Sequence, residues 1–139
     1  MTVGFEFDEA KFNEKIKNHR FLNKPVGGLW GSPVDSVWGW KDWCDSEDFR
    51  TSTLHIQFKW KFKAGAKVLV IDSVSDLVNT LKKFPRTVQK GLSYSYLDWE
   101  RLAKRYDGIH LTDKGFAECR FDFDYGISSW DCESIVAFN

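Results

Sequence analysis

The sequence of 139 residues has few cysteines and no net charge. Each of these two features disfavours a class of protein. Its cysteines are Cys44, Cys119 and Cys132, and twenty basic residues balance twenty acidic ones. Three cysteines without metal-ligand spacing fit reduced thiols better than a disulfide framework or a zinc site. A chain without net charge has no global field that would draw it to nucleic acid or to a membrane surface.

Long apolar runs are also missing. None approaches the roughly 18 residues that a membrane-spanning helix requires. Residues 1–7 contain neither the basic nor the apolar segment of a signal peptide. We therefore expect a soluble, cytoplasmic, monomeric protein that binds no metal. The length allows one hydrophobic core, so residues 1–139 are expected to form a single domain.

Periodicity of apolar residues predicts the strands. Residues 55–62 alternate most clearly, with apolar and aromatic side chains on one face and polar ones on the other. Further strands are predicted at 3–7, 29–31, 67–71 (buried) and 108–111. Residues 113–115 are expected to form a turn before a strand over 118–124.

Helices are predicted where a polar capping residue precedes apolar residues at helical spacing. They cover residues 9–18, 37–45 after a cap at Ser36, 73–84 starting at Ser73, and 95–106 starting at Ser95. This order predicts a compact α+β domain with three to four helices. The strands are expected to be mixed, mostly antiparallel, and arranged in two small sheets.

Two acidic residues open the apolar C-terminal segment. Asp131 and Glu133 stand two positions apart, and in a strand such residues share one face. The two carboxylates would then point the same way at the mouth of a buried sheet, where they could carry chemistry. The alternative is a solvated strand edge or cap.

A glycine-rich segment around Trp30 is the second candidate. Residues 24–33 contain three glycines and two prolines, without the spacing of a phosphate loop or dinucleotide fingerprint. The backbone could approach a ligand beside Trp30, with Ser32 offering a hydroxyl, or form a tight turn around a core tryptophan.

Tryptophans are frequent in the next segment, and no histidine has an evident catalytic partner. Trp38, Trp40 and Trp43 cannot share one helix face, so at least one is expected to line a surface or groove unless all pack in the core. No histidine is paired with a nucleophile or shows metal-ligand spacing, which disfavours a catalytic triad or a zinc site.

Together these segments resemble the ADP-ribosyltransferase family. Members often end a core strand on Gln-x-Glu or Glu-x-Glu, and Asp131-Cys132-Glu133 is similar to that motif with Asp in first position. The run Gly28-Leu29-Trp30-Gly31-Ser32 looks like the second motif, a short strand before the helix that floors the nicotinamide pocket. His19 and Arg20 are the stand-ins for the first motif.

The resemblance implies an ADP-ribosyltransferase fold and transfer of ADP-ribose from NAD to a protein or nucleic-acid acceptor. Such an effector could be a toxin or a phage-encoded modifier. Glu133 would stabilise the positive charge on the ribose, and Asp131 would orient or deprotonate the acceptor. The remaining residues expected to bind NAD by stacking, hydrogen bonding or charge are Trp30, Trp43, Ser32, Lys24 and Arg20.

Two other functions stay open. A non-catalytic inhibitor of the phage or anti-defence type could dock on a protein through exposed tryptophans, since fold alone does not decide function. A third possibility is contact with nucleic acid through lysines beside Trp60. They are Lys59, Lys61, Lys63 and Lys67.

Overall fold

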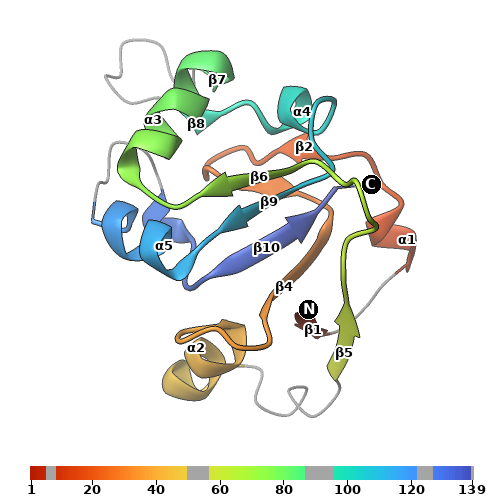
Figure 1. Cartoon of the computed structure of the whole chain (residues 1–139), viewed down its shortest axis with the longest axis vertical. Coiled ribbons are helices and arrows are strands. Elements are labelled where there is room, and N and C mark those ends of the chain that lie inside the picture. Colours follow the sequence, from red (N-terminus) through yellow and green to blue (C-terminus); the bar gives the residue numbers. More distant parts are fainter. Residues whose placement is uncertain (6–8, 50–56, 87–95, 122–126, 139) are drawn as a thin grey trace.

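A six-stranded sheet organises the molecule, in the order β5-β1-β4-β10-β9-β6 (Figure 1). The computed structural model describes residues 1–5, 9–49, 57–86, 96–121 and 127–138. Strands β6 and β9 are parallel, and every other neighbouring pair in the sheet is antiparallel. The strands are β1 (Thr2–Phe5), β4 (Leu29–Pro33), β5 (Gln57–Trp60), β6 (Val68–Ile71), β9 (Gly108–Leu111) and β10 (Ser134–Ala137).

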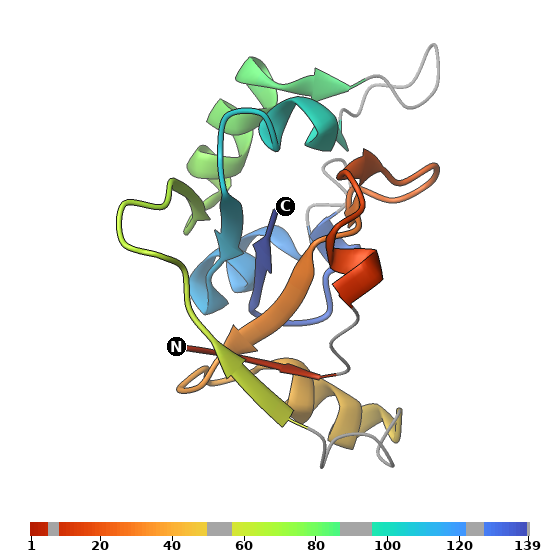
Figure 2. The same ribbon diagram turned by 90° about the vertical axis from the view of Figure 1, so that its right-hand side faces the viewer.

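Two short ribbons and a set of helices complete the described chain. One ribbon pairs β2 (Lys17–Asn18) with β3 (Pro25–Val26), and the other pairs β7 (Pro85–Arg86) with β8 (Tyr96–Leu97). The helices are α1 (Glu9–Phe12), α2 (Trp40–Glu47), α3 (Val74–Lys83), α4 (Trp99–Leu102) and α5 (Asp113–Cys119), with a 3-10 turn, η3 (Ile127–Ser129). Figures 1 and 2 show α2 at the same end of the molecule as β1 and β5, and α3 and α4 at the opposite end.

The result is a compact α+β domain with mixed, mostly antiparallel strands, which confirms the predicted class. The expectation of two small sheets is wrong, because β4 joins what would otherwise be two. Residues Leu29–Gly31 pair with β10, whereas Ser32 and Pro33 pair with β1. One strand thus belongs to both halves of the sheet.

The core lies between one face of the sheet and helices α3, α4 and α5. Val136 and Ile109 are partners in the register of β10 and β9, so both point to this face. The fully buried core side chains are Leu77 of α3, Trp99 and Leu102 of α4, Ile71, Leu97, Ile109, Leu111, Trp130 and Val136. Helix α3 matches its prediction: the Ser73 hydroxyl accepts a hydrogen bond from the Asp76 N–H at 3.1 Å.

Several predicted elements differ from the structure in their bounds or their burial. The helix expected over 9–18 ends at Phe12, and residues 17–18 pair in a ribbon. The helix expected over 37–45 begins at Trp40, and the helix expected from Ser95 begins after Asp98, whose carboxylate caps it. The strand over 67–71 lies at the sheet edge, so Val70 is half exposed. Of the strand over 55–62, residues 57–60 are confirmed, and 55–56 lie outside the described chain.

Two adjoining predictions have the wrong type in the described residues. Residues 113–115, expected to form a turn, begin α5, and this helix covers the start of the strand expected over 118–124. The Thr112 hydroxyl accepts a hydrogen bond from the Gly115 N–H at 3.0 Å and caps the helix. Phe116 and Cys119, three positions apart, are both buried. Residues 122–124 lie outside the described chain.

Candidate functional site

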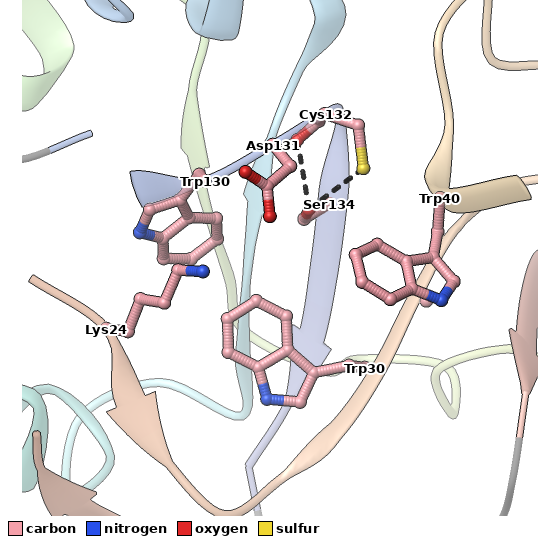
Figure 3. A pocket seen from close by; sticks show the side chains of 8 residues that line it. Lys24, Trp30, Trp40, Trp130, Asp131, Cys132 and Ser134 are labelled. Atoms are coloured by element: carbon pink, nitrogen blue, oxygen red, sulfur yellow. Dashed lines mark hydrogen bonds between the residues drawn. The ribbon is translucent and has the colours of Figure 1, made fainter. Parts of the chain in front are cut away.

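A cavity of about 300 Å³ opens beside the start of β10 (Figure 3). It is lined by Lys24, Trp30, Gly31, Trp40, Trp130, Asp131, Cys132 and Ser134. These residues come from the segment before β3, from β4, from the start of α2 and from the approach to β10. The antiparallel pairing of β4 with β10 brings the second and the last of these segments together.

Three tryptophan rings form walls of the cavity, and two of them are held by hydrogen bonds. The ring centroids of Trp30 and Trp130 lie 5.1 Å apart. The Trp130 indole N–H donates to the carbonyl oxygen of Asn23 at 2.7 Å, and the Trp30 indole N–H donates to that of Gly27 at 3.1 Å. The rings therefore have fixed positions and can offer apolar faces without ordering cost on binding.

One basic and one acidic side chain share this aromatic surrounding. Figure 3 shows the Lys24 amine and the Asp131 carboxylate on the same side of the cavity, beside Trp130. Burial lowers the pKa of Lys24, and the nearby charge of Asp131 partly offsets this. Burial raises the pKa of Asp131, and Lys24 partly offsets that shift. Each group thus favours the charged form of the other, while partial burial opposes both charges.

The thiol of Cys132 is neutral at physiological pH. Burial raises its pKa to about 11, although the hydroxyls of Ser134 and Ser32 lie 3.8 and 4.0 Å from the sulfur. A protonated thiol is a poor nucleophile. We therefore assign Cys132 no nucleophilic role, and its neutral thiol forms part of the cavity lining.

Glu133 faces a different direction from Asp131, so the expectation that the two acids share one face is wrong. Residues 131–133 precede β10, and the period-two rule for strands does not apply to them. The Glu133 carboxylate is buried and lies 2.8 Å from Nε2 of His110. His110 pairs in register with Ile135, on the face opposite to Val136 and the core. Glu133 is not among the residues that line the cavity.

Ser32 stands behind the cavity wall, where both functions of its hydroxyl are used. The Ser32 hydroxyl donates to the carbonyl oxygen of Glu133 and accepts from the N–H of Trp40, both at 2.8 Å. It therefore holds the N-terminus of α2 against the segment before β10. Ser36 does not take this role, contrary to the predicted cap.

The other two residues expected to bind NAD lie away from the cavity lining. Arg20 is exposed, and its guanidinium lies 5.1 Å from the centre of the Phe21 ring. Trp43 stacks on Trp40, with 5.1 Å between ring centres and 13° between planes, and so supports a wall of the cavity from behind.

The cavity thus joins Lys24, Trp30 and Asp131 of the predicted site and adds residues that the sequence did not single out. Trp40 was one of three tryptophans on a predicted helix, and no periodicity distinguished it from the other two. Trp130 is adjacent to Asp131, and this adjacency is its only signal in the sequence.

Fold and site together define a compact α+β domain with a tryptophan-walled cavity next to a central strand. Comparison of the chain with protein-family models, curated proteins and solved structures gives no match. Within the described ranges, no group of three or more His, Cys, Asp or Glu side chains could hold a metal ion. None of the described helices has the length and apolar character needed to cross a bilayer.

Proposed function

We propose that the protein is an ADP-ribosyltransferase-like enzyme that binds the nicotinamide end of NAD in the cavity beside β10. One observation carries the proposal: Asp131 follows Lys24 and Trp30 by more than a hundred residues in the sequence, yet all three line the same cavity. Each has a chemical property that this ligand requires.

The residues present fit the nicotinamide end of NAD. The ring is planar and positively charged while it is bonded to the ribose, and indole faces attract such cations. The carboxylate of Asp131 adds a negative charge, and Lys24 can pair with a phosphate or carboxamide oxygen. A volume of about 300 Å³ is at the lower end for small-molecule sites, so the cavity suits one end of the dinucleotide.

In the proposed reaction, Asp131 stabilises the positive charge that develops on the ribose. That charge arises when the bond from ribose C1′ to nicotinamide breaks and nicotinamide leaves with the electron pair. A partly buried carboxylate that lies beside the developing charge is suited to this task. A nucleophilic atom of the acceptor then bonds to C1′ and releases its proton to Asp131 or to solvent.

Glu133 has a supporting role in this proposal. Its carbonyl oxygen accepts from Ser32 and its carboxylate pairs with His110, so both ends of the residue are fixed. These contacts hold the backbone that carries Asp131. The proposal thereby transfers the charge-stabilising role, first predicted for Glu133, to Asp131.

A comparison of Asp131→Asn with Glu133→Gln tests this proposal. NAD labelled in its adenylate half is incubated with protein and cell lysate, and both released nicotinamide and labelled acceptor are measured. We expect Asp131→Asn to lower turnover about 10²–10³-fold and Glu133→Gln to keep most of it. The opposite order would return the catalytic role to Glu133. If the unaltered protein neither binds NAD in calorimetry nor releases nicotinamide, the proposal is refuted.

The second candidate function is docking on another protein. The tryptophans expected to serve as exposed contacts are not exposed, but another apolar surface is. All seven tryptophans are partly or fully buried. Exposed apolar side chains do gather around the β2–β3 ribbon: Phe21 is 67% exposed, Val26 43% and Leu22 38%. If docking is the function, Phe21→Ser should abolish capture of a protein partner from lysate, while Asp131→Asn should leave it intact.

A further inference from the structure

A second cavity, of about 570 Å³, lies across the sheet from the first. Leu29 and Ala137 are register partners and both line it, whereas Trp30 alternates with Leu29 and lines the first cavity. The rest of its wall includes Trp60, Phe62 and the loop that follows them. The sheet separates the two cavities, so a ligand of the second is independent of the NAD site proposed above.

Two aromatic rings form part of this second cavity. Trp60 and Phe62 meet edge to face, with ring centres 5.4 Å apart. The Phe62 ring is seated against Gly108, where a Cβ atom would collide with it. The indole Nε1 of Trp60 is buried and has no hydrogen-bond partner among the residues that the structure describes. A buried donor without a partner is costly, and a small turn of the ring towards a bound acceptor would relieve that cost.

Lysines accompany these rings along the chain. From residue 59 to 63 exposed and half-buried side chains alternate, and every exposed one is a lysine. Lys61 and Lys63 line the cavity, and Lys59 extends the row beyond it. None of the three forms an ion pair with a carboxylate of the described residues. The one carboxylate in the lining, that of Asp107, accepts the backbone N–H of Lys67 at 2.7 Å.

We propose that this second cavity and its lysine row bind single-stranded nucleic acid. A base would occupy the cavity against Trp60 and Phe62, and the phosphate backbone would follow the lysines. Aromatic rings beside a basic row are the combination with which proteins bind single strands. The four residue steps from Lys59 to Lys63 would span about 13 Å at the rise of a strand, although β5 itself ends at Trp60. This row continues past the cavity, which favours a strand over a single nucleotide.

The experiment measures fluorescence anisotropy of labelled oligothymidylate and oligouridylate of about twelve nucleotides, without NAD, at about 50 mM and 200 mM salt. The test variant is Lys61→Ala/Lys63→Ala. The matched control is Lys82→Ala/Lys83→Ala, which removes two exposed lysines from the end of α3. We expect the test variant to weaken binding at least tenfold, and the control less than twofold. The slope of log affinity against log salt should fall by about 1.4 in the test variant, roughly 0.7 for each lost phosphate contact.

A second variant addresses the base. Trp60→Phe keeps an aromatic ring but removes the indole, and we expect roughly tenfold weaker binding of the oligonucleotide. The thermal melt of Trp60→Phe, followed by circular dichroism, should match that of the unaltered protein, so that weaker binding cannot be attributed to unfolding.

Three results would overturn the inference. One is absence of binding at about 50 mM salt, and another is equal loss in the two double-lysine variants, which would indicate nonspecific attraction. The third is competition by thymidine monophosphate or inorganic phosphate at the same nucleotide concentration as the strand, which would assign the site to a small phosphorylated ligand. Because NAD is absent throughout, none of these results depends on the NAD site.

Discussion

Replacement of Asn23 by alanine should strongly destabilise the fold, because this side chain satisfies two donors in the core. Asn23 is fully buried, and its Oδ1 accepts the backbone N–H of Leu97 at 2.9 Å and the indole N–H of Trp99 at 3.2 Å. Alanine would leave both donors buried without a partner. Each costs about 1–3 kcal/mol, so the free energy of unfolding should fall by about 2–6 kcal/mol. That loss is a large share of the roughly 5–15 kcal/mol that stabilises a typical domain.

Urea denaturation followed by circular dichroism measures this effect. With a urea slope of about 2 kcal/mol/M, the midpoint should fall by at least about 1 M. Asn79→Ala is the control, because Asn79 is exposed on α3 and its replacement should change the free energy of unfolding by less than about 0.5 kcal/mol. Equal midpoints for Asn23→Ala and Asn79→Ala would refute the reasoning.

Other perturbations test glycine packing, thiol reactivity and the charge in the cavity. Gly115→Ala should lower the free energy of unfolding by about 2 kcal/mol or more, because its Cβ would collide with the Ile71 carbonyl. Gly65→Ala is the comparison, since a Cβ there meets nothing and only the positive φ of 82° opposes alanine. Thermal melts of the two variants measure the difference. Cys132, with its pKa raised to about 11, should react with iodoacetamide at pH 8 far more slowly in the folded than in the unfolded protein, and fast labelling of Cys132 in the folded state would contradict its burial. Burial raises the pKa of Asp131, so the folded state binds that proton more tightly than the unfolded state, and this contribution to stability falls as pH rises through the raised pKa. Asp131→Asn should therefore melt no lower than the unaltered protein at pH 7, and the difference should vanish below the unfolded pKa of about 3.9; a lower melting temperature at pH 7 would mean that attraction to Lys24 outweighs desolvation.

Local signals in the sequence were sufficient to predict those elements whose structure depends on residues close by in the chain. The capped start of α3 at Ser73 and the alternation at 57–60 depend on neighbours within a few residues, and both predictions hold. The segment after residue 112 was misassigned because two periods competed. Cys119 and Phe121 alternate as in a strand, but Phe116 and Cys119 also fit one helix face, and Gly115 allows the helix to approach the Ile71 carbonyl.

The candidate site was less predictable because its contacts are long-range. The rule that paired Asp131 with Glu133 requires both residues to lie in a strand, and the described strand begins at Ser134. What orients Glu133 is His110, from a neighbouring strand, and no spacing in the sequence connects the two. Trp130 is likewise fixed by the Asn23 carbonyl, more than a hundred residues earlier in the chain.

These contacts explain why two acids separated by one residue occupy different environments. Glu133 is held at its carboxylate by His110 and at its carbonyl by Ser32, whose hydroxyl also accepts the first N–H of α2. With Glu133 fixed on one side of the sheet, the chain must turn before it, and Asp131 enters the tryptophan-walled cavity with Lys24. Ser32→Ala removes the hydrogen bonds to Glu133 and from Trp40 and the contact with the Cys132 sulfur. In the proposed reaction it should weaken nicotinamide release by displacing Asp131, while all residues of the cavity remain. A Ser32→Thr variant, which keeps the hydroxyl, should restore part of the activity, and equal loss in both variants would separate Ser32 from the positioning of Asp131.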